Sequence, residues 1–444
     1  MRAARVVDGA HHEVLVVGGG QAGLSVSHHL VAAGVDHLVV ERDSVAHEWR
    51  DGRWDAFTLV TPNWHCRLPG YPYDGPDPDG FMRRDEVYEW VRRYADTFDA
   101  PVAEGVTVTG LAPRPGGGFV VTTTAGTVTA NAVTAAVGGY HVPVVPSWAA
   151  ALPEHVVQVQ SYDYRSADEL PPGPVLVVGT GQSGTQIAED LLLAGREVHL
   201  AAGRAPRVAR RYRGKDCMTW LAEMGVYDVP VAARGLAKRE STNHYVTGRD
   251  GGRDLDLRDF ARRGMRLYGR ATGVVDDGSG RALTFSPTLA RDLDHADSVA
   301  ESIKDDIDRW IETQGIDAPP EERYVPVWRP GAELERLDLA GLAAVVWSVG
   351  FRADWTWLGD LAPAVLDPEG HPRHVRGLSP VPGLSFVGLP WLHTWGSGRF
   401  LGIAQDTGHV AAAVRDWRAG GSWDGPAAHT LTEPAPASSS AAAG

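Results

Sequence analysis

Two glycine-rich segments of identical spacing point most directly to chemistry in this chain. Each is a G-x-G-x-x-G pattern that follows a short apolar stretch and precedes a sequence of helical periodicity. The glycines are Gly18, Gly20 and Gly23 in the first pattern and Gly179, Gly181 and Gly184 in the second. In such a pattern the first glycine permits a sharp turn, the second lets the backbone approach a pyrophosphate, and the third lets the helix pack closely on the strand. Because the N-terminal N–H groups of that helix then face the phosphate, two such patterns predict two bound dinucleotides and electron transfer between them. The alternative for either pattern is a plain strand–helix turn.

The residues that follow each pattern distinguish the two nucleotides. After the first, the apolar residues 38–40 end at Glu41. A carboxylate there accepts hydrogen bonds from ribose hydroxyls and repels a 2′-phosphate, which favours FAD or NAD. After the second, residues 198–200 lead to Arg204 without an acidic residue, and a guanidinium group suits a phosphate dianion, which favours NADPH. Further arginines in this segment are Arg207, Arg210 and Arg211. The alternative for this run of arginines is a solvent-exposed surface strip.

The composition limits the class of protein. The chain has 444 residues, with 42 Lys and Arg against 56 Asp and Glu, and a net charge of −14. This length predicts roughly two to three domains. The negative charge and the local clustering of the arginines argue against a nucleic-acid partner. The first residues lack the apolar core of a signal peptide, and no apolar run reaches the length of about 18 residues that a transmembrane helix needs. We therefore expect a soluble, cytoplasmic protein with no membrane partner.

The cysteines and histidines do not form a redox or metal motif. Cys66 and Cys217 are far apart and not in C-x-x-C spacing. This argues against a disulfide framework and against the dithiol flavin reductases, which need an adjacent redox pair. The histidine pairs at 11–12 and 28–29 have no companion ligands, so no metal site is predicted.

The predicted fold class is α/β, with two Rossmann-like dinucleotide-binding domains. Residues 12–165 form the first part of the FAD domain, and residues 166–348 form an NADPH domain that is inserted into it. The chain returns to the FAD domain over residues 349–420. An apolar stripe predicts a helical insertion in the NADPH domain near residues 289–314. The tail at 424–444 is of low complexity and predicted to be disordered.

Within these domains the sequence predicts further elements. Residues 61–73 are rich in turn formers and predict a loop, whereas the residues after Asp85 predict a helix that this residue caps. Short strands between 106 and 132 predict a β-hairpin insertion, and a separate buried strand follows at 133–137. Further strands are predicted at 343–347 and 384–388, and a helix begins near Gly402 and runs through Ala404, His409 and Val414.

Residues 12–417 resemble the class B flavin-dependent monooxygenases. This superfamily includes flavin-containing, N-hydroxylating, Baeyer–Villiger and plant indole-3-pyruvate monooxygenases. The resemblance rests on the two fingerprints, on Arg204, and on strand–glycine links at Gly138 and Gly350, which in the family join the FAD and NADPH domains. Residues 61–73 and 248–269 are similar to bacterial FAD/NAD(P)-dependent oxidoreductases.

The resemblance implies an activity. NADPH reduces FAD, and the reduced flavin activates O2 as a C4a-(hydro)peroxyflavin that oxygenates a small organic substrate, which is an amine, thioether, ketone or keto acid. The bound NADP⁺ shields that species from water. The protein then excludes solvent and places the substrate, since the cofactor supplies the oxygen chemistry. This accounts for the lack of an obvious acid–base triad in the sequence.

Two positions depart from the family pattern. In the signature between the nucleotide motifs, Tyr164 and Arg165 align with the end, but Gln160 stands where the family has His, and the leading F-x-G is missing. Val60 stands where animal-type members have an asparagine that steadies the peroxyflavin. The plant indole-3-pyruvate enzymes also lack that asparagine, so oxidation of a keto acid or an amine stays open.

The fingerprints and the resemblance together give the candidate site residues. The cofactor-binding candidates are Gly18, Gly20, Gln21, Ala22, Gly23, Glu41, Arg42, Trp49, Arg50, Gly138, Gly179, Gly181, Gln182, Ser183, Gly184, Arg204, Arg207, Gly350, Gly388 and Gln405. The catalytic candidates are Gln160, Tyr164, Trp391, His393 and Arg399. Trp49 has the alternative of an ordinary core aromatic residue. The aromatic segment 391–395 either lines a substrate cavity or covers the flavin, and His393 either moves protons or is a surface histidine.

The leading interpretation is an NADPH-dependent FAD monooxygenase whose partners are a small-molecule substrate and O2. One alternative is an NAD(P)H-dependent flavin oxidoreductase, such as a quinone or electron-carrier reductase, without oxygen insertion. Another is a redox-sensing protein that binds FAD and NADP. The substrate and the oligomeric state, with a homodimer among the alternatives, are not determined by the sequence.

Overall fold

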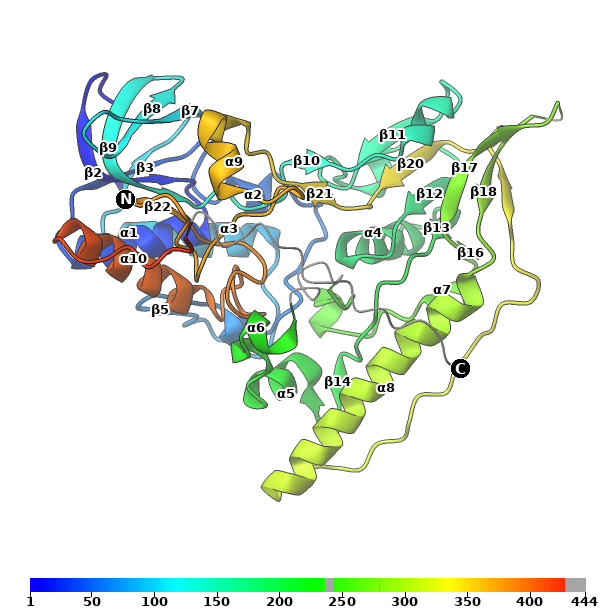
Figure 1. The fold of residues 1–444 in the computed structure, drawn as a ribbon. Helices are drawn as coiled ribbons and strands as arrows, with labels where there is room; N and C mark the ends of the chain where they lie inside the picture. Colours follow the sequence, from blue (N-terminus) through cyan, green and yellow to red (C-terminus); the bar gives the residue numbers. More distant parts are fainter. Residues whose placement is uncertain (236–242, 279, 428–444) are drawn as a thin grey trace. The chain divides into compact units, whose positions relative to one another are not determined.

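The computed structural model describes residues 1–235, 243–278 and 280–427, and the chain divides into two compact units (Figure 1). Most of the predicted tail, residues 428–444, lies outside the described residues. The first unit consists of Met1–Val45, Tyr94–Gly138 and the chain from Asp354 onward, and the second consists of Ala46–Arg93 and Gly139–Ala353. Each unit contains one of the two glycine patterns, so each is described by itself.

A sheet with the strand order β1-β6-β3-β2-β9-β8-β7 forms the centre of the first unit, and β22 pairs with β9. Its strands are β1 (Arg2–Ala3), β2 (His11–Val17), β3 (His37–Val40), β6 (Pro101–Ala103), β7 (Val108–Pro113), β8 (Phe119–Thr123), β9 (Gly126–Ala135) and β22 (Leu384–Phe386). The strands β1, β6, β3, β2, β9 and β22 pair in parallel. Strand β8 pairs antiparallel with both β7 and β9. The predicted hairpin insertion is therefore confirmed.

Strand β9 replaces two predicted strands. The sequence predicted separate strands at 128–132 and 133–137, but one strand runs from Gly126 to Ala135. Its first half alternates between buried and partly buried residues because it pairs with the hairpin, and its last four residues are all buried in the parallel part of the sheet. The change in burial along a single strand produced the apparent break.

The second unit is built on a five-stranded sheet of order β11-β20-β12-β13-β16, in which all pairs are parallel. Its strands are β11 (Val157–Gln160), β12 (Val175–Val178), β13 (Val198–Ala201), β16 (Arg266–Tyr268) and β20 (Ala344–Trp347). The strands β12, β13 and β20 are buried along their whole length. Parallel strands covered on both faces are continuously apolar, as these sequences are.

The remaining strands form small sheets. They are β4 (Arg67–Leu68) with β5 (Tyr71–Pro72), β10 (Val142–Pro143) with β21 (Phe351–Arg352), β14 (Arg211–Tyr212) with β15 (Lys215–Asp216), and β17 (Ala271–Asp276) with β18 (Arg281–Phe285) and β19 (Arg336–Asp338). The pair of β10 and β21 brings together the two links that follow Gly138 and Gly350. The segment 61–73 is a loop except for a 3-10 turn at Asn63–His65 and the short pair of β4 and β5.

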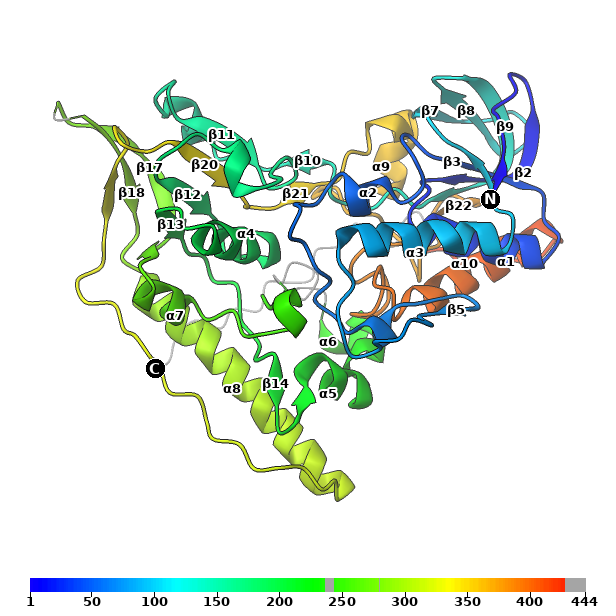
Figure 2. The ribbon, with the colours of Figure 1, turned by 180° about the vertical axis from the view of Figure 1, so that it is seen from behind.

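The helices are α1 (Gln21–Ala32), α2 (His47–Arg50), α3 (Arg84–Thr97), α4 (Gln182–Leu193), α5 (Cys217–Glu223), α6 (Val231–Arg234), α7 (Leu257–Arg262), α8 (Leu289–Gln314), α9 (Ala362–Val365) and α10 (Ile403–Arg418). Helix α8 has the bounds that the sequence predicted, and α10 begins after Gly402 as predicted. In the first unit, α1 and α10 lie side by side (Figures 1 and 2). Within the described residues, no helix has the length and hydropathy to cross a bilayer.

The prediction that Asp85 caps α3 is wrong. The helix begins at Arg84, so Asp85 lies inside its first turn. The backbone N–H of Arg83 donates to Glu86 Oε2 at 2.7 Å instead. A carboxylate that reaches back to the backbone N–H preceding the helix is the reciprocal half of a capping box, so Glu86 has the role that the sequence assigned to Asp85.

Candidate dinucleotide-binding sites

The first glycine pattern forms the turn between β2 and α1. A side chain on Gly18, which has φ of +111°, would place its Cβ 2.5 Å from the carbonyl oxygen of Ala136, and a side chain on Gly23 would collide with the carbonyl oxygen of Gly18. At Gly20, by contrast, an added Cβ would meet no atom within 4 Å. The outer glycines are thus needed for packing, and the middle one leaves backbone open to a ligand.

The second pattern, between β12 and α4, repeats this geometry. Gly179 has φ of +106°, and a Cβ there would collide with the carbonyl oxygen of Ser348. A Cβ on Gly184 would collide with the carbonyl oxygen of Gly179, whereas one on Gly181 would meet nothing within 4 Å. Gly20 and Gly181 are the N-cap residues of α1 and α4, and neither has a side chain that could satisfy the first N–H groups of its helix. Both helix ends therefore have the form of a pyrophosphate-binding site.

Glu41 follows β3 and contacts the first glycine turn. Its Oε2 accepts the backbone N–H of Gly19 at 2.5 Å, and its Oε1 accepts the N–H of Asp43 at 2.9 Å. Burial raises the pKa of Glu41, while these two N–H groups act in the opposite direction. Because each carboxylate oxygen can accept more than one hydrogen bond, both can still accept a ribose hydroxyl. Arg42 is exposed and its Nε donates to Asp43 Oδ2 at 2.9 Å, so it points to its neighbour in the chain.

Arg204 follows β13 in the second unit. The N–H of Gly203 donates to Thr180 Oγ1 at 2.9 Å, which joins the segment of Arg204 to the second glycine turn. Arg204 is exposed, and we find no ion pair for it within the described part of the chain. Thr180 was not among the predicted residues; its only sequence signal is its place directly after Gly179. A free guanidinium beside the turn is suited to a 2′-phosphate.

The neighbouring arginines have other partners. Arg207 is buried, and its Nε donates to Asp297 Oδ1 at 2.6 Å. Arg210 is also buried, and it pairs through Nη2 with Asp216 Oδ1 at 2.6 Å and donates through Nη1 to the carbonyl oxygen of Val60 at 2.7 Å. These two guanidinium groups support the protein interior, which corrects the expectation that they are free phosphate ligands. Arg211, in contrast, is exposed.

Tyr164 is buried against α4, and its predicted catalytic role stays a prediction. Its ring is 1% exposed, and its hydroxyl donates to Asp190 Oδ2 on α4 at 2.7 Å. Burial raises the pKa of this phenol, and the Asp190 carboxylate raises it further, so it stays protonated. Arg249 Nη1 donates to the other oxygen of Asp190 at 2.7 Å. Gln160 is half-buried at the end of β11, and its catalytic role stays a prediction.

The aromatic segment that follows β22 is closely packed in the first unit. The rings of Trp391 and Trp395 stack at 6.2 Å, and the Arg399 guanidinium lies 4.8 Å from the centre of the Trp395 ring. Ser397 Oγ accepts the N–H groups of His393 and Thr394, each at 3.0 Å. The segment is thus a rigid turn with a half-buried imidazole. Burial lowers the pKa of His393, with Arg376 acting in the same direction, so the ring is neutral near pH 7.

This segment lies against the first glycine turn. A Cβ on Gly388, which has φ of +76°, would lie 2.5 Å from the Ala22 side chain, and Gln21 Nε2 donates to the carbonyl oxygen of Gly398 at 3.3 Å. Gln405 is exposed in the first turn of α10. The structure therefore brings Gly388 and the aromatic segment to the start of α1, as the predicted flavin site requires.

Trp49 and Arg50 lie on α2 in the second unit. The Trp49 ring is half-buried beside Phe57 at 6.4 Å, and Arg50 pairs with Asp51 at 3.0 Å and lies 4.4 Å from the centre of the Tyr88 ring. Gln182 donates through Nε2 to the carbonyl oxygen of Val246. The cofactor contacts predicted for these residues and for Ser183 stay predictions.

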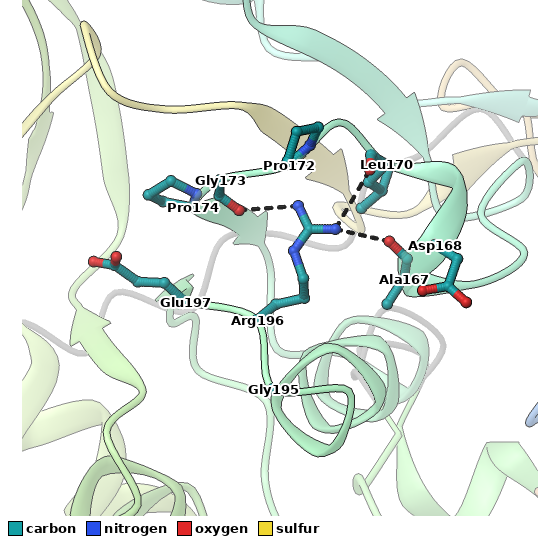
Figure 3. A pocket seen from close by; sticks show the side chains of 9 residues that line it. All are labelled: Ala167, Asp168, Leu170, Pro172, Gly173, Pro174, Gly195, Arg196 and Glu197. Carbon is teal, nitrogen blue, oxygen red and sulfur yellow. Dashed lines mark hydrogen bonds between the residues drawn. The ribbon is translucent and has the colours of Figure 1, made fainter.

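A surface hollow of about 530 Å³ lies elsewhere in the second unit (Figure 3). Arg196 occupies it and donates to the carbonyl oxygens of Ala167, Leu170 and Gly173 at 2.7, 3.4 and 2.9 Å. The hollow lies where β12 and β13 begin, and ligands of such sheets bind where the parallel strands end. It is therefore not a cofactor site. Within the described ranges we find no cluster of side chains that could hold a metal ion.

Comparison with known proteins agrees with this geometry. Residues 15–222 match the family model "Pyridine nucleotide-disulphide oxidoreductase". An uncharacterized oxidoreductase, CzcO-like, of Geobacillus kaustophilus is 27% identical over 401 residues, which cover 90% of this chain and 97% of the relative. The indole-3-pyruvate monooxygenase YUCCA1 of Oryza sativa is 29% identical over 206 residues, which cover 44% of this chain and 49% of the relative.

The fold is shared with solved flavoenzymes. The flavin-containing monooxygenase of Stenotrophomonas maltophilia has a TM-score of 0.60 at 19% identity, covering 92% of this chain and 99% of the other. The ornithine N-hydroxylase of Kutzneria sp. 744, described with FADred, NADP⁺ and L-orn, has a TM-score of 0.62 at 18% identity and covers 92% of this chain and 100% of the other.

The chain is an oxidoreductase with the paired dinucleotide-binding fold of the flavoproteins. The predicted α/β fold and the predicted resemblance to class B flavin-dependent monooxygenases are confirmed. The predicted cofactors, FAD and NADPH, agree with the same comparisons. The relatives of Geobacillus kaustophilus and Bacillus subtilis, which each match over 90% of this chain, are described as uncharacterized oxidoreductases.

Proposed function

We propose that this protein is an NADPH-dependent FAD monooxygenase that oxygenates a small organic substrate. The observation that carries the proposal is the matched pair of glycine turns with different residues beside them. Gly20 and Gly181 each leave a helix N-terminus open, but Glu41 borders the first turn and Arg204 follows the strand beside the second. A carboxylate excludes a 2′-phosphate and a guanidinium attracts it, so the first turn suits FAD and the second suits NADPH.

The state of the cysteines argues against a dithiol relay as the electron acceptor. Cys66 and Cys217 are both buried and unpaired. Burial raises the pKa of Cys66 to about 12 and raises that of Cys217 as well. Thiols with such pKa values are poor nucleophiles, and a dithiol relay needs two that are adjacent and reactive.

Bound FAD would supply the chemistry of accepting a hydride and activating O2. The chain's own residues would bind and orient the cofactors: Glu41 would hold the FAD ribose and Arg204 the 2′-phosphate of NADPH. The N-terminus of α10 would present its N–H groups to the flavin, and Trp391 and Trp395 would exclude water from it. His393, which is neutral near pH 7, would accept a proton on the substrate side.

The test is anaerobic mixing of the FAD-loaded protein with NADPH, followed by oxygen. The proposal predicts that NADPH bleaches the flavin and that oxygen consumption matches product formation with a substrate from the amine, thioether, ketone or keto-acid classes. Turnover that proceeds equally well without O2, with a quinone as acceptor, would indicate the alternative flavin oxidoreductase. A flavin that NADPH does not reduce would indicate a nucleotide-binding sensor.

The nucleotide assignment has its own test. Replacing Arg204 by Gln removes a charged hydrogen-bond donor, so the KM for NADPH should rise about 10- to 100-fold while the KM for NADH is unchanged. Arg211→Gln is the matched control because Arg211 is an exposed arginine of the same segment. An equal effect of both substitutions would contradict a specific role for Arg204.

A further inference from the structure

We propose that Asp297, on the inserted helix α8, is a positioning residue that sets the preference for NADPH by holding the loop that carries Arg204. The inference rests on the proposed function, in which Arg204 binds the 2′-phosphate. It concerns a residue that lies 90 positions or more from the loop in sequence and that no fingerprint includes.

Asp297 joins two buried arginines. Its Oδ1 accepts Nε–H of Arg207 at 2.6 Å, and its Oδ2 accepts Nε–H of Arg258 at 2.8 Å. The side chains of Arg207 and Arg258 are 3% and 2% exposed, and that of Asp297 is 14% exposed. A buried guanidinium needs a paired carboxylate because the interior does not solvate its charge. The position of Arg207 therefore depends on Asp297.

The other contacts of Arg207 fix the loop after β13 in one path. The Tyr324 ring lies 4.0 Å from the guanidinium, and the Tyr324 hydroxyl donates to Asp256 Oδ2 at 2.8 Å. One residue earlier, the carbonyl oxygen of Pro206 accepts the N–H of Tyr245 at 3.0 Å. The loop has no strand or helix at this point, so an isolated β-bridge between Arg207 and Tyr245 and the side-chain contacts of Arg207 hold it in place.

The same framework reaches the second glycine turn. Val246, which follows Tyr245, accepts Nε2–H of Gln182 and, at 3.1 Å, Nε2–H of Gln186, both on α4. The start of α4 and the loop of Arg204 are therefore tied to one segment. Because Arg204 is three residues from Arg207, a shift of Arg207 moves Arg204 relative to the nucleotide. Helix α8 thus acts on the 2′-phosphate through Asp297 and Arg207, without contacting the phosphate itself.

The test measures binding of two nucleotides to the FAD-loaded protein by titration calorimetry. The probes are 2′,5′-ADP, which has the 2′-phosphate, and 5′-AMP, which lacks it. Asp297→Asn keeps the shape but removes the charge, and we expect about tenfold weaker binding of 2′,5′-ADP with binding of 5′-AMP unchanged. A purely structural role would weaken both nucleotides alike.

Asp294→Asn is the matched control. Asp294 lies one turn earlier on α8 and accepts from Arg258 Nη2 at 2.6 Å, but its side chain is 61% exposed. We expect it to leave the binding of both nucleotides unchanged. Arg207→Gln should reproduce the effect of Asp297→Asn, and the double variant should lose no more than either single one, because both act through the same contact.

Tyr324→Leu gives a second route if Asp297→Asn does not fold, because it removes the ring beside Arg207 at a half-buried position. It should also weaken 2′,5′-ADP selectively. A wild-type protein that does not distinguish the two nucleotides would contradict the proposed use of NADPH. If the wild-type protein prefers 2′,5′-ADP over 5′-AMP and both Asp297→Asn and Tyr324→Leu keep the same preference, the proposed role of Asp297 is wrong.

Discussion

At the scale of single residues, the glycines of each fingerprint differ in what a methyl group would meet. At Gly181 the φ is −63° and an added Cβ would have open space, whereas at Gly184 it would collide with the carbonyl oxygen of Gly179 and lie 2.9 Å from the Ser348 Cβ. The first position therefore has open space, which the proposed function assigns to a ligand, and the second is needed for packing.

Two alanine substitutions separate these roles. Gly184→Ala should lower the free energy of unfolding by about 1–3 kcal/mol because the helix must move away from the strand. Gly181→Ala should leave that free energy unchanged or raise it by a few tenths of a kcal/mol. Urea denaturation measures both. An unfolded Gly181→Ala protein would contradict the assignment of the open space to a ligand.

Glu189 on α4 is a buried carboxyl group that the sequence did not predict. It is 1% exposed, and Arg253 Nη1 donates to its Oε1. Burial raises its pKa from 4.5 to about 7, although the nearby arginines Arg253 and Arg249 act in the opposite direction. The folded state therefore binds this proton more tightly than the unfolded state does.

The consequence is a loss of stability as the pH rises. Between about pH 4.5 and pH 7 the unfolded chain releases the proton and the folded chain keeps it, so the free energy of unfolding falls with rising pH. Each unit of pKa difference corresponds to about 1.4 kcal/mol. Glu189→Gln should remove this dependence, so that its stability relative to wild type improves from pH 5 to pH 7.5 in urea denaturation. Glu312→Gln, at an exposed carboxylate, should retain the slope of the wild type, and an identical slope in all three proteins would refute the assignment.

At the scale of elements, the hydrogen bond between Tyr164 and Asp190 joins the segment after β11 to α4. The sequence placed Tyr164 in a catalytic signature, but its contact is structural. In the proposed function α4 presents its N-terminus to the nucleotide, and its acidic residues Glu189 and Asp190 pair with Arg253 and Arg249 on the segment after Thr247. The helix is thus fixed on a side that does not face the ligand.

Tyr164→Phe tests this role. Loss of one buried hydrogen bond to a charged acceptor should lower the free energy of unfolding by about 1.5–3 kcal/mol. Asp190 keeps its pair with Arg249, so α4 should stay in place. We therefore expect kcat for NADPH oxidation to change less than twofold, which corresponds to less than about one kcal/mol of activation free energy. A large loss of kcat with unchanged stability would restore the catalytic assignment.

The elements also show where sequence patterns suffice. The apolar stripe from Leu289 to Gln314 predicted α8 with its observed bounds. An apolar period of 3.6 residues that continues over many turns is typical of an amphipathic helix and not of a strand or a loop. Strand β9 was divided in the prediction, because its burial changes where its partner changes from an antiparallel to a parallel strand. That change depends on neighbours distant in sequence.

At the scale of the whole molecule, the two fingerprints belong to different compact units. Gly20 and Gly181 can therefore be altered separately. Gly20→Ala should yield protein with little bound FAD but with wild-type affinity for 2′,5′-ADP, and Gly181→Ala should keep its FAD and lose at least tenfold in that affinity, as expected for a blocked pyrophosphate contact. The flavin spectrum of the purified proteins and calorimetry measure the two effects. Loss of FAD in both variants would indicate that the sites are not independent.

The sequence by itself determined the two glycine turns. Glycine spacing after an apolar strand has a local cause, since the turn, the close helix and the open N-terminus all arise within a few residues. Glu41 and Arg204 could be identified in the same way, because each follows the next apolar strand in the sequence. For this reason the fold class and the resemblance to flavin monooxygenases followed from the sequence.

Only the tertiary structure decided which polar residues are free. Arg204 and Arg207 are equivalent in the sequence, yet one is exposed and the other is buried against Asp297. Likewise, only the structure shows that the Tyr164 hydroxyl donates to Asp190 on α4. The availability of a side chain depends on contacts between segments that are far apart in the chain, and no local pattern encodes those contacts.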